Sequence, residues 1–197
     1  MRRMLMLLCA LLLSPSPAAA QGQPVKLKVG MVAAVDMLAL PIAVERGFYE
    51  KQGLDVTLAR PYATGVDALN ALQAGETAEK FLAAVSEADK WMRQNPKQAA
   101  AIGTRWFPGL KPDVAEAAMQ YNIQQVDRRI SANNYRALWS AQDTLQRLGV
   151  LKSVFDVNKH IEPKHIINVM AKHPELFSDL APIPADVAVK PGFVFKP

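Results

Sequence analysis

The chain is predicted to be an α/β protein with a short βαβα unit at its N-terminus and a mainly helical second half. Two strand-like segments, Leu27–Val32 and Leu54–Ala59, are separated by a helical pattern and a turn at Gly47–Gly53. A second helix is expected from Thr64, which completes the βαβα order. Beyond Gly75, apolar side chains recur every three or four residues, which is the period of an amphipathic helix.

The clearest helical pattern follows Gly75, and Asn95-Pro96 predicts its end. We expect Asn95 to cap the next helix and Pro96 to take its first position, where the missing N–H costs nothing. The apolar positions that define the first of these helices are Phe81, Leu82, Val85, Ala88, Trp91 and Met92.

Two more helices are expected before the tail. Asp113 is predicted to cap a helix over Val114–Gln125, after a loop at Pro108–Asp113. A helix over Tyr135–Leu148 should end at Gly149, because glycine is favoured just past a helix C-terminus. Its apolar side would consist of Leu138, Ala141, Leu145 and Leu148.

Prolines punctuate the last forty residues. They predict short helices around Pro163–Lys172 and an extended, poorly packed end from Pro182.

The first 20 residues read as a secretory signal peptide. Arg2-Arg3 precedes the apolar run Met4–Leu13, and Ala18–Ala20 supplies a small-residue cleavage site. Cleavage after Ala20 would place the mature chain in the periplasm. The single cysteine, Cys9, lies in the removed segment, so we expect no disulfide in the mature protein.

Charge and length exclude other classes. Removing Arg2 and Arg3 lowers the basic count from 23 to 21 against 18 acidic residues, so the net charge falls from +5 to +3. The basic residues are scattered among acids, unlike those of nucleic-acid-binding proteins. Of the 197 residues, 177 follow Ala20, which is enough for one well-packed domain and too few for two large lobes.

Two stretches carry a family resemblance. Ala43–Val56 reads AVERGFYEKQGLDV, and Gly65–Glu76 reads GVDALNALQAGE. These two sequence motifs resemble those in the first lobe of the solute-binding proteins of ABC importers of the sulfonate, nitrate and taurine type. The resemblance implies a periplasmic-binding-protein-like lobe, a small anionic ligand, an ABC permease in the inner membrane as partner, and no bond chemistry.

The resemblance also implies an internal deletion at Gly75–Thr77. About a hundred residues, roughly a domain, are missing there relative to the family, and a looser likeness resumes from Thr77. We therefore divide the chain into a signal peptide (1–20), the N-terminal βαβα part of the first lobe (21–76), its helical remainder (77–158) and a Pro-rich tail (159–197).

At this junction two outcomes are open. The flanking helices fuse into one, with Gly75 a weak point costing about 1 kcal/mol, or they break, with Gly75 closing the first helix and Thr77 capping the second. The apolar spacing favours fusion or a kinked pair.

The resemblance implies ligand-binding residues in two loops. They are Ala34, Val35 and Asp36 after the first strand, and Thr64, Gly65 and Val66 at the entrance of the second helix. Gly65 permits close approach to the backbone, and helix-end N–H groups favour an anion. Asp36 suits an ammonium group, as on an amino-sulfonate. The alternative is that Thr64 and Asp36 only cap helices.

Other residues point less clearly to a site. His160, Glu162, His165 and His173 are suitable metal ligands, but their spacing favours solvated or capping histidines, and we expect no metal and no cofactor. Trp91, Trp106 and Trp139 are expected in the core rather than stacked on a ligand. We find no nucleophile elbow, P-loop or zinc-protease motif, so we expect no enzyme activity.

Three functional readings remain open. The first is a shortened importer component with weakened binding. The second is a secreted helical interaction protein or dimer, which buries the apolar surface and open sheet edges left by the deletion. The third is a degenerate homologue without a function.

Overall fold

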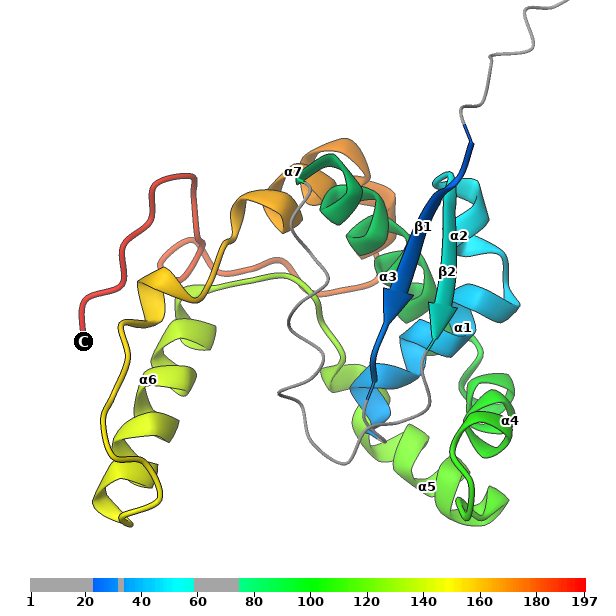
Figure 1. The fold of residues 1–197 in the computed structure, drawn as a ribbon, viewed down its shortest axis with the longest axis horizontal. Coiled ribbons are helices and arrows are strands. Elements are labelled where there is room, and N and C mark those ends of the chain that lie inside the picture. Colours follow the sequence, from blue (N-terminus) through cyan, green and yellow to red (C-terminus); the bar gives the residue numbers. More distant parts are fainter. Residues whose placement is uncertain (1–22, 32–33, 59–74) are drawn as a thin grey trace, which may run out of the picture.

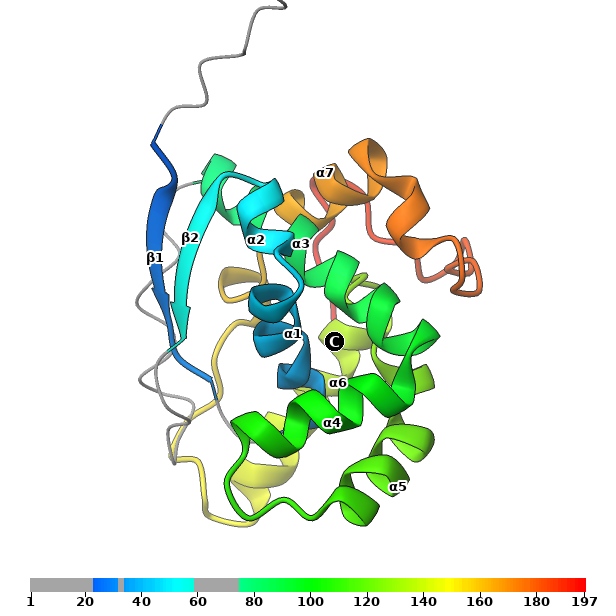
Figure 2. The same ribbon diagram turned by 90° about the vertical axis from the view of Figure 1, so that its right-hand side faces the viewer.

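The computed structural model describes residues 23–31, 34–58 and 75–197. It shows a mixed α/β chain that is mostly helical, as the sequence predicts (Figure 1). Strands β1 (Val25–Val29) and β2 (Leu54–Leu58) form a two-stranded parallel sheet with Val25 opposite Leu54. Figure 2 shows α1, α2 and α3 on one side of this sheet. A crossover through helices between parallel strands is the βαβ arrangement.

The first predicted strand is displaced. β1 begins two residues before Leu27, because Val25 donates its N–H to the Gly53 carbonyl (2.9 Å) and pairs with β2, and it ends at Val29. The second strand begins at Leu54 as predicted and is described as far as Leu58.

Three short helical segments connect the strands. They are the 3₁₀ helix η1 (Val35–Leu38), α1 (Ala39–Glu45) and α2 (Phe48–Lys51). α2 lies within the segment predicted as a turn. Gly47 (φ 70°) and Gly53 (φ 69°) flank it in the left-handed conformation, which other residues rarely adopt.

Helix α3 (Gly75–Gln94) forms the centre of the fold. Its Ala84, Val85, Ala88 and Met92 side chains are buried in the main apolar core, which α3 forms with α1, α2 and Leu54 of β2. α3 runs without interruption through Thr77, so the alternative in which Thr77 caps a new helix is wrong. The expected helix from Thr64, and hence its fusion with α3, lies outside the described residues.

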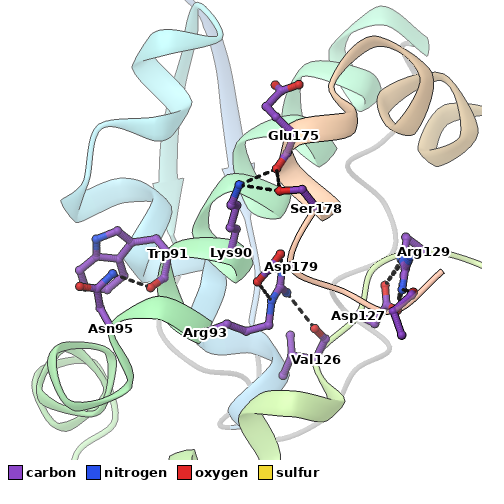
Figure 3. Close-up of polar contacts among 11 residues, drawn as sticks. Lys90, Trp91, Arg93, Asn95, Val126, Asp127, Arg129, Glu175, Ser178 and Asp179 are labelled. Atoms are coloured by element: carbon purple, nitrogen blue, oxygen red, sulfur yellow. Dashed lines mark hydrogen bonds and ion pairs between the residues drawn. The ribbon is translucent and has the colours of Figure 1, made fainter.

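Helices α4 (Pro96–Trp106) and α5 (Pro112–Asn122) follow, with the 3₁₀ helix η3 (Ile123–Gln125) after them. Pro96 is the first residue of α4 as predicted, but the Asn95 side chain does not cap α4. Its Nδ2 donates to the Trp91 carbonyl (2.8 Å) and so closes the end of α3 (Figure 3). Asp113 is not a cap either, because α5 begins one residue earlier at Pro112.

Helix α6 (Ala132–Arg147) begins three residues earlier than predicted, because a Ser131–Asn134 capping box stabilises its start. Gly149 follows it with a φ of 72°, as expected for a glycine that ends a helix. The predicted apolar side of α6 is not buried at its C-terminal end. Leu148 is 71 % exposed and Leu145 is 39 % exposed, and Trp139, expected in the core, is 37 % exposed.

The C-terminal region folds back over α3 and α6. The 3₁₀ helix η4 (Val157–Lys159), α7 (Lys164–Lys172) and the 3₁₀ helix η5 (Pro174–Phe177) precede an irregular tail. α7 and η5 pack against α3 in a second apolar cluster that contains Ile166, Val169 and Phe177.

The tail from Pro182 has no long helix or strand and most of its residues are exposed, as predicted, but Phe195 anchors it to the rest of the fold. Phe195 is buried and, with Phe193, contacts the Tyr135 ring of α6. The Phe195 N–H donates to Asn158 Oδ1 (2.8 Å), and Ser131 forms a bridge with Ala188. Among the described helices, none has the length and apolar character needed to cross a membrane.

Candidate functional site

A polar cavity of about 500 Å³ lies beside the loop that follows β1. Its lining comes from η1, from the end of α5 with η3, and from the segment after them. In open α/β sheets, ligands bind outside the carboxyl ends of the strands, and β1 ends toward this loop. The lining residues are Asp36, Asn122, Gln125, Val126, Asp127 and Arg128.

Three arginine contacts hold the segment Val126–Arg129, which we call the rim segment. The first comes from α3, where Arg93 donates Nη1 to the Val126 carbonyl (3.0 Å). The same guanidinium pairs with Asp179 (2.7 Å), and this lowers the pKa of the Asp179 carboxyl (Figure 3). Because the Arg93 side chain is only 5 % exposed, these contacts are well shielded from water.

The second contact lies within the rim segment. Arg129 donates to both carboxylate oxygens of Asp127 at 2.8–3.1 Å (Figure 3). It also donates to the Ala181 carbonyl at 2.8 Å. Lys90 adds a link between α3 and the end of η5, through the Glu175 carbonyl (2.5 Å) and Ser178 Oγ (3.2 Å). The rim segment is thus tied to the irregular tail as well as to α3.

The third contact is a buried ion pair. Arg128 Nε lies 2.7 Å from Asp89 Oδ2, and the Asp89 side chain is only 2 % exposed. Arg128 Nη2 is 3.4 Å from the other Asp89 oxygen and also donates to the Asp36 carbonyl. One guanidinium therefore joins α3, the rim segment and the loop after β1.

Burial dominates the chemistry of Asp89. It raises the pKa of the carboxyl to about 6, although Arg128 and Arg93 favour the charged form. Asp127 adds to the rise by like-charge repulsion.

Two buried hydroxyls lie in the same part of the molecule. Tyr49 Oη and Ser86 Oγ have no hydrogen-bond partner among the described residues, and Ser86 is three residues before Asp89 on α3. Burial raises the pKa of the Tyr49 phenol, and the charges of Arg128 and Asp89 act on it. Unpaired buried polar groups beside a buried ion pair are more typical of functional sites than of cores.

A second cavity, of about 320 Å³, is apolar and lies between η1, α4 and α5. Gly103 permits the close packing there, since a Cβ at this position would meet both Leu38 methyl groups at 3.4 Å. The other lining residues are Ala34, Ala100, Phe107, Pro108, Leu110, Ala115, Ala118 and Met119.

The structure places the predicted loop residues as follows. Asp36 lines the polar cavity, Ala34 lines the apolar one, and Val35 begins η1 between them. Asp36 does not cap η1 or α1, so the capping alternative for this residue is wrong. The other three predicted site residues, Thr64, Gly65 and Val66, lie outside the described residues.

Sequence reasoning missed the rim segment and Asp89. A signal for Asp89 was present, because a carboxylate stands next to Ala88 and three residues before Met92 on the face of α3 that packs in the core. The Asp127-Arg128-Arg129 triplet offered no comparable signal, since charged triplets are common on surfaces.

The histidines do not converge. His165 Nδ1 lies 3.7 Å from Glu79 Oε1, and His173 Nδ1 lies 3.4 Å from Glu175 Oε1. The His160 ring makes an edge-to-face contact with Phe155. Within residues 23–31, 34–58 and 75–197, no three His, Cys, Asp or Glu side chains are grouped where they could hold a metal ion. Trp91 and Trp106 pack, partly buried, against the main core.

Comparison with known proteins gave no relative. No family model, no curated protein and no solved structure matches this chain.

The raised pKa of Asp89 predicts a pH-dependent stability. A carboxyl that ionises at about 6 in the folded state and at 3.8 when unfolded favours folding below pH 4, and this contribution is lost as the pH rises to about 6. Two pKa units correspond to about 3 kcal/mol. Between pH 4 and pH 6, the parent should therefore lose about that much unfolding free energy relative to Asp89→Asn. Urea denaturation at several pH values measures the difference.

The control for this prediction is Asp143→Asn, which alters an exposed i,i+4 ion pair with Arg147 on α6. It should show a small difference from the parent with little pH dependence. A parent-minus-Asp89→Asn difference that stays constant from pH 4 to pH 7 would contradict the assigned environment of Asp89.

Proposed function

We propose that this protein binds a small anionic solute in the polar cavity, as the periplasmic substrate-binding component of an ABC importer of the sulfonate, taurine or nitrate type. One observation carries the proposal. The loop that the family resemblance assigns to the ligand contributes Asp36 to a polar cavity at the carboxyl end of β1. The role would be binding and delivery to a membrane permease, without bond chemistry.

The lining chemistry supports recognition of a small polar molecule. The Gln125 amide and the Arg128 guanidinium supply hydrogen-bond donors, and the Asn122 amide, which donates one N–H to the Ala118 carbonyl (3.0 Å), has a second N–H. The Asp127 charge is compensated by Arg129, whereas the Asp36 carboxylate has no ion-pair partner in the described part of the chain. An ammonium group on the solute would find its partner at Asp36.

Binding should be weak. In the resembled family two lobes close over the ligand and exclude water, which strengthens each polar contact. This chain would supply one lobe only. We expect dissociation constants in the millimolar range, which correspond to roughly −4 kcal/mol of binding free energy.

Neutralising the charge of Asp36 is the sharpest test of this placement. In Asp36→Asn, ethanesulfonate should bind more tightly, because a repelling carboxylate is removed. Taurine should bind less tightly in this variant, because its ammonium group loses the Asp36 carboxylate as a partner. The ratio of the two dissociation constants should therefore change by about 3-fold to 10-fold in favour of ethanesulfonate, as expected for one exposed charge contact. NMR titration of the parent and the variant measures it.

The matched control is Asp143→Asn on α6, which removes one carboxylate away from the cavity and should leave the ratio unchanged. Equal ratios in the parent and Asp36→Asn would place the solute elsewhere. Absence of saturable binding of nitrate, taurine and ethanesulfonate by the parent would overturn the proposed function.

Self-association is a second candidate function, and one observation favours it. Large apolar side chains are exposed along α6 and the loop after it, which we call the α6 strip. Gln142 fixes this loop by two hydrogen bonds to the Phe155 backbone (2.8 and 2.9 Å). Exposed large apolar side chains that gather on one segment are candidates for a protein contact. The strip consists of Trp139, Leu145, Leu148, Val150, Val154 and Phe155.

Light scattering tests this candidate. If the α6 strip is an interface, the purified protein should be a dimer, and Leu148→Lys with Val150→Lys should convert it to a monomer, because two buried charges without partners oppose association. A monomeric parent at concentrations near 100 µM, about the level at which a weak interface would still assemble, would count against self-association.

A further inference from the structure

Arg128 differs from the charged residues next to it at the polar cavity, apart from Asp36, which has no ion-pair partner among the described residues. Asp127, Arg129 and Arg93 are all paired, and their charges are compensated within the protein. Arg128 also has a partner, but the bonds to Asp89 and the Asp36 carbonyl use only Nε and Nη2. Its Nη1 donates to no described residue, and it is not among the buried polar atoms that lack a partner. Arg128 lines the polar cavity, and Nη1 is its one guanidinium nitrogen that no contact within the described residues uses.

The guanidinium is held firmly in this orientation. The Arg128 side chain is 23 % exposed, whereas the Asp89 carboxylate behind it is 2 % exposed. A planar guanidinium bound along its Nε–Nη2 edge has its remaining nitrogen fixed in space. Lysine could not reproduce this arrangement, because an ammonium lacks the planar fork.

A gain in folding stability does not explain the Asp89–Arg128 ion pair. Placing a carboxylate in the interior costs free energy, and the partner's attraction often fails to repay it. Here burial outweighs the attraction of two arginines, since the pKa of Asp89 lies above its ordinary value. The remaining physical effect of Asp89 is positional, because it fixes one face of the polar cavity.

We propose that Arg128 Nη1 is the anchor for the acid group of the solute, a sulfonate or carboxylate, and that the buried Asp89 is its positioning residue. The proposal deepens the proposed function and rests on it. The neighbouring Gln125 and Asn122 amides lie at the same cavity and can add hydrogen bonds to the acid group. Fixed donors with a supporting second layer give directional recognition of an oxyanion.

The test uses the protein purified after expression of the full sequence, with ethanesulfonate as the probe, followed by NMR and calorimetry. Arg128→Gln should weaken binding by about 10-fold or more, as expected for loss of a charge-assisted hydrogen bond. Arg128→Lys should keep only part of the affinity. Asp89→Asn should weaken binding by about 3-fold to 10-fold, and it should have no further effect when combined with Arg128→Gln. Circular dichroism verifies that each variant is folded.

A pH profile separates positioning from a purely structural role. Ethanesulfonate stays ionised between pH 5 and pH 8. The charged and titratable groups that act on Asp89 are Arg128 and Asp127 from the rim segment and Arg93 from α3, with the Tyr49 phenol of α2 nearby. In the parent, affinity should fall as the pH drops below about 6, because protonated Asp89 releases the guanidinium. In Asp89→Asn the profile should be flat.

The matched controls are Arg147→Gln and Asp143→Asn, which change an exposed Arg–Asp pair on α6 and should leave affinity and profile unchanged. Equal ethanesulfonate affinity in the parent and Arg128→Gln would overturn the assignment of Arg128 and leave solute binding standing. An Asp89→Asn effect of the same size with and without Arg128 would overturn the positioning role. A parent that binds none of ethanesulfonate, taurine and nitrate would overturn the proposed function itself.

Discussion

The polar cavity keeps its shape because a carboxylate on the buried face of α3 has to be paired. Asp89 cannot reach water, so the chain must bring a cation to it, and Arg128 is that cation. The Arg128 bond to the Asp36 carbonyl then fixes the loop after β1. Three segments far apart in the sequence are thereby joined at one guanidinium.

Helix α3 supports this arrangement in two ways. Its apolar residues, including Val85 and Met92, belong to the main core together with residues of α1, α2 and β2. Its polar residues Lys90 and Arg93 hold η5 and the residues after it, through contacts to Glu175 and Asp179 (Figure 3). At the other end of α3, Glu79 accepts bonds from Asn168 and Lys172 of α7, which lower the pKa of its carboxyl to about 2. The C-terminal forty residues thus contact and stabilise the same helix that carries Asp89.

Much of the fold could be predicted from short sequence patterns, because interactions between residues close in sequence determine those elements. The α/β class, the long helix to Gln94 and the glycine end at Gly149 follow from apolar period and backbone preference. The start of β1 at Val25 depends on pairing with β2, which no local pattern contains. The packing of Phe195 on Tyr135 joins residues sixty apart, so a proline-rich, irregular sequence gave no sign of it.

The candidate site was predictable only in part. Asp36 was predicted because it belongs to a loop that the family resemblance assigns to the ligand, and the structure places it at a polar cavity. Arg128 and Asp89 were not found, because their importance comes from a contact across 39 residues between a helix and an irregular segment. Asn95 shows the same limit at short range, since capping propensity alone does not tell which of two adjoining helices its amide serves.

Site-resolved NMR tests the central claim most directly. Ethanesulfonate added to isotope-labelled protein should produce saturable shifts at the Arg128 side-chain Nε–H and at the backbone amides of Asp36 and the rim segment. The Nε–H of Arg147 on exposed α6 should not follow the same curve. Shifts confined to the α6 strip, or equal at both arginines, would contradict solute recognition at the Asp89–Arg128 pair.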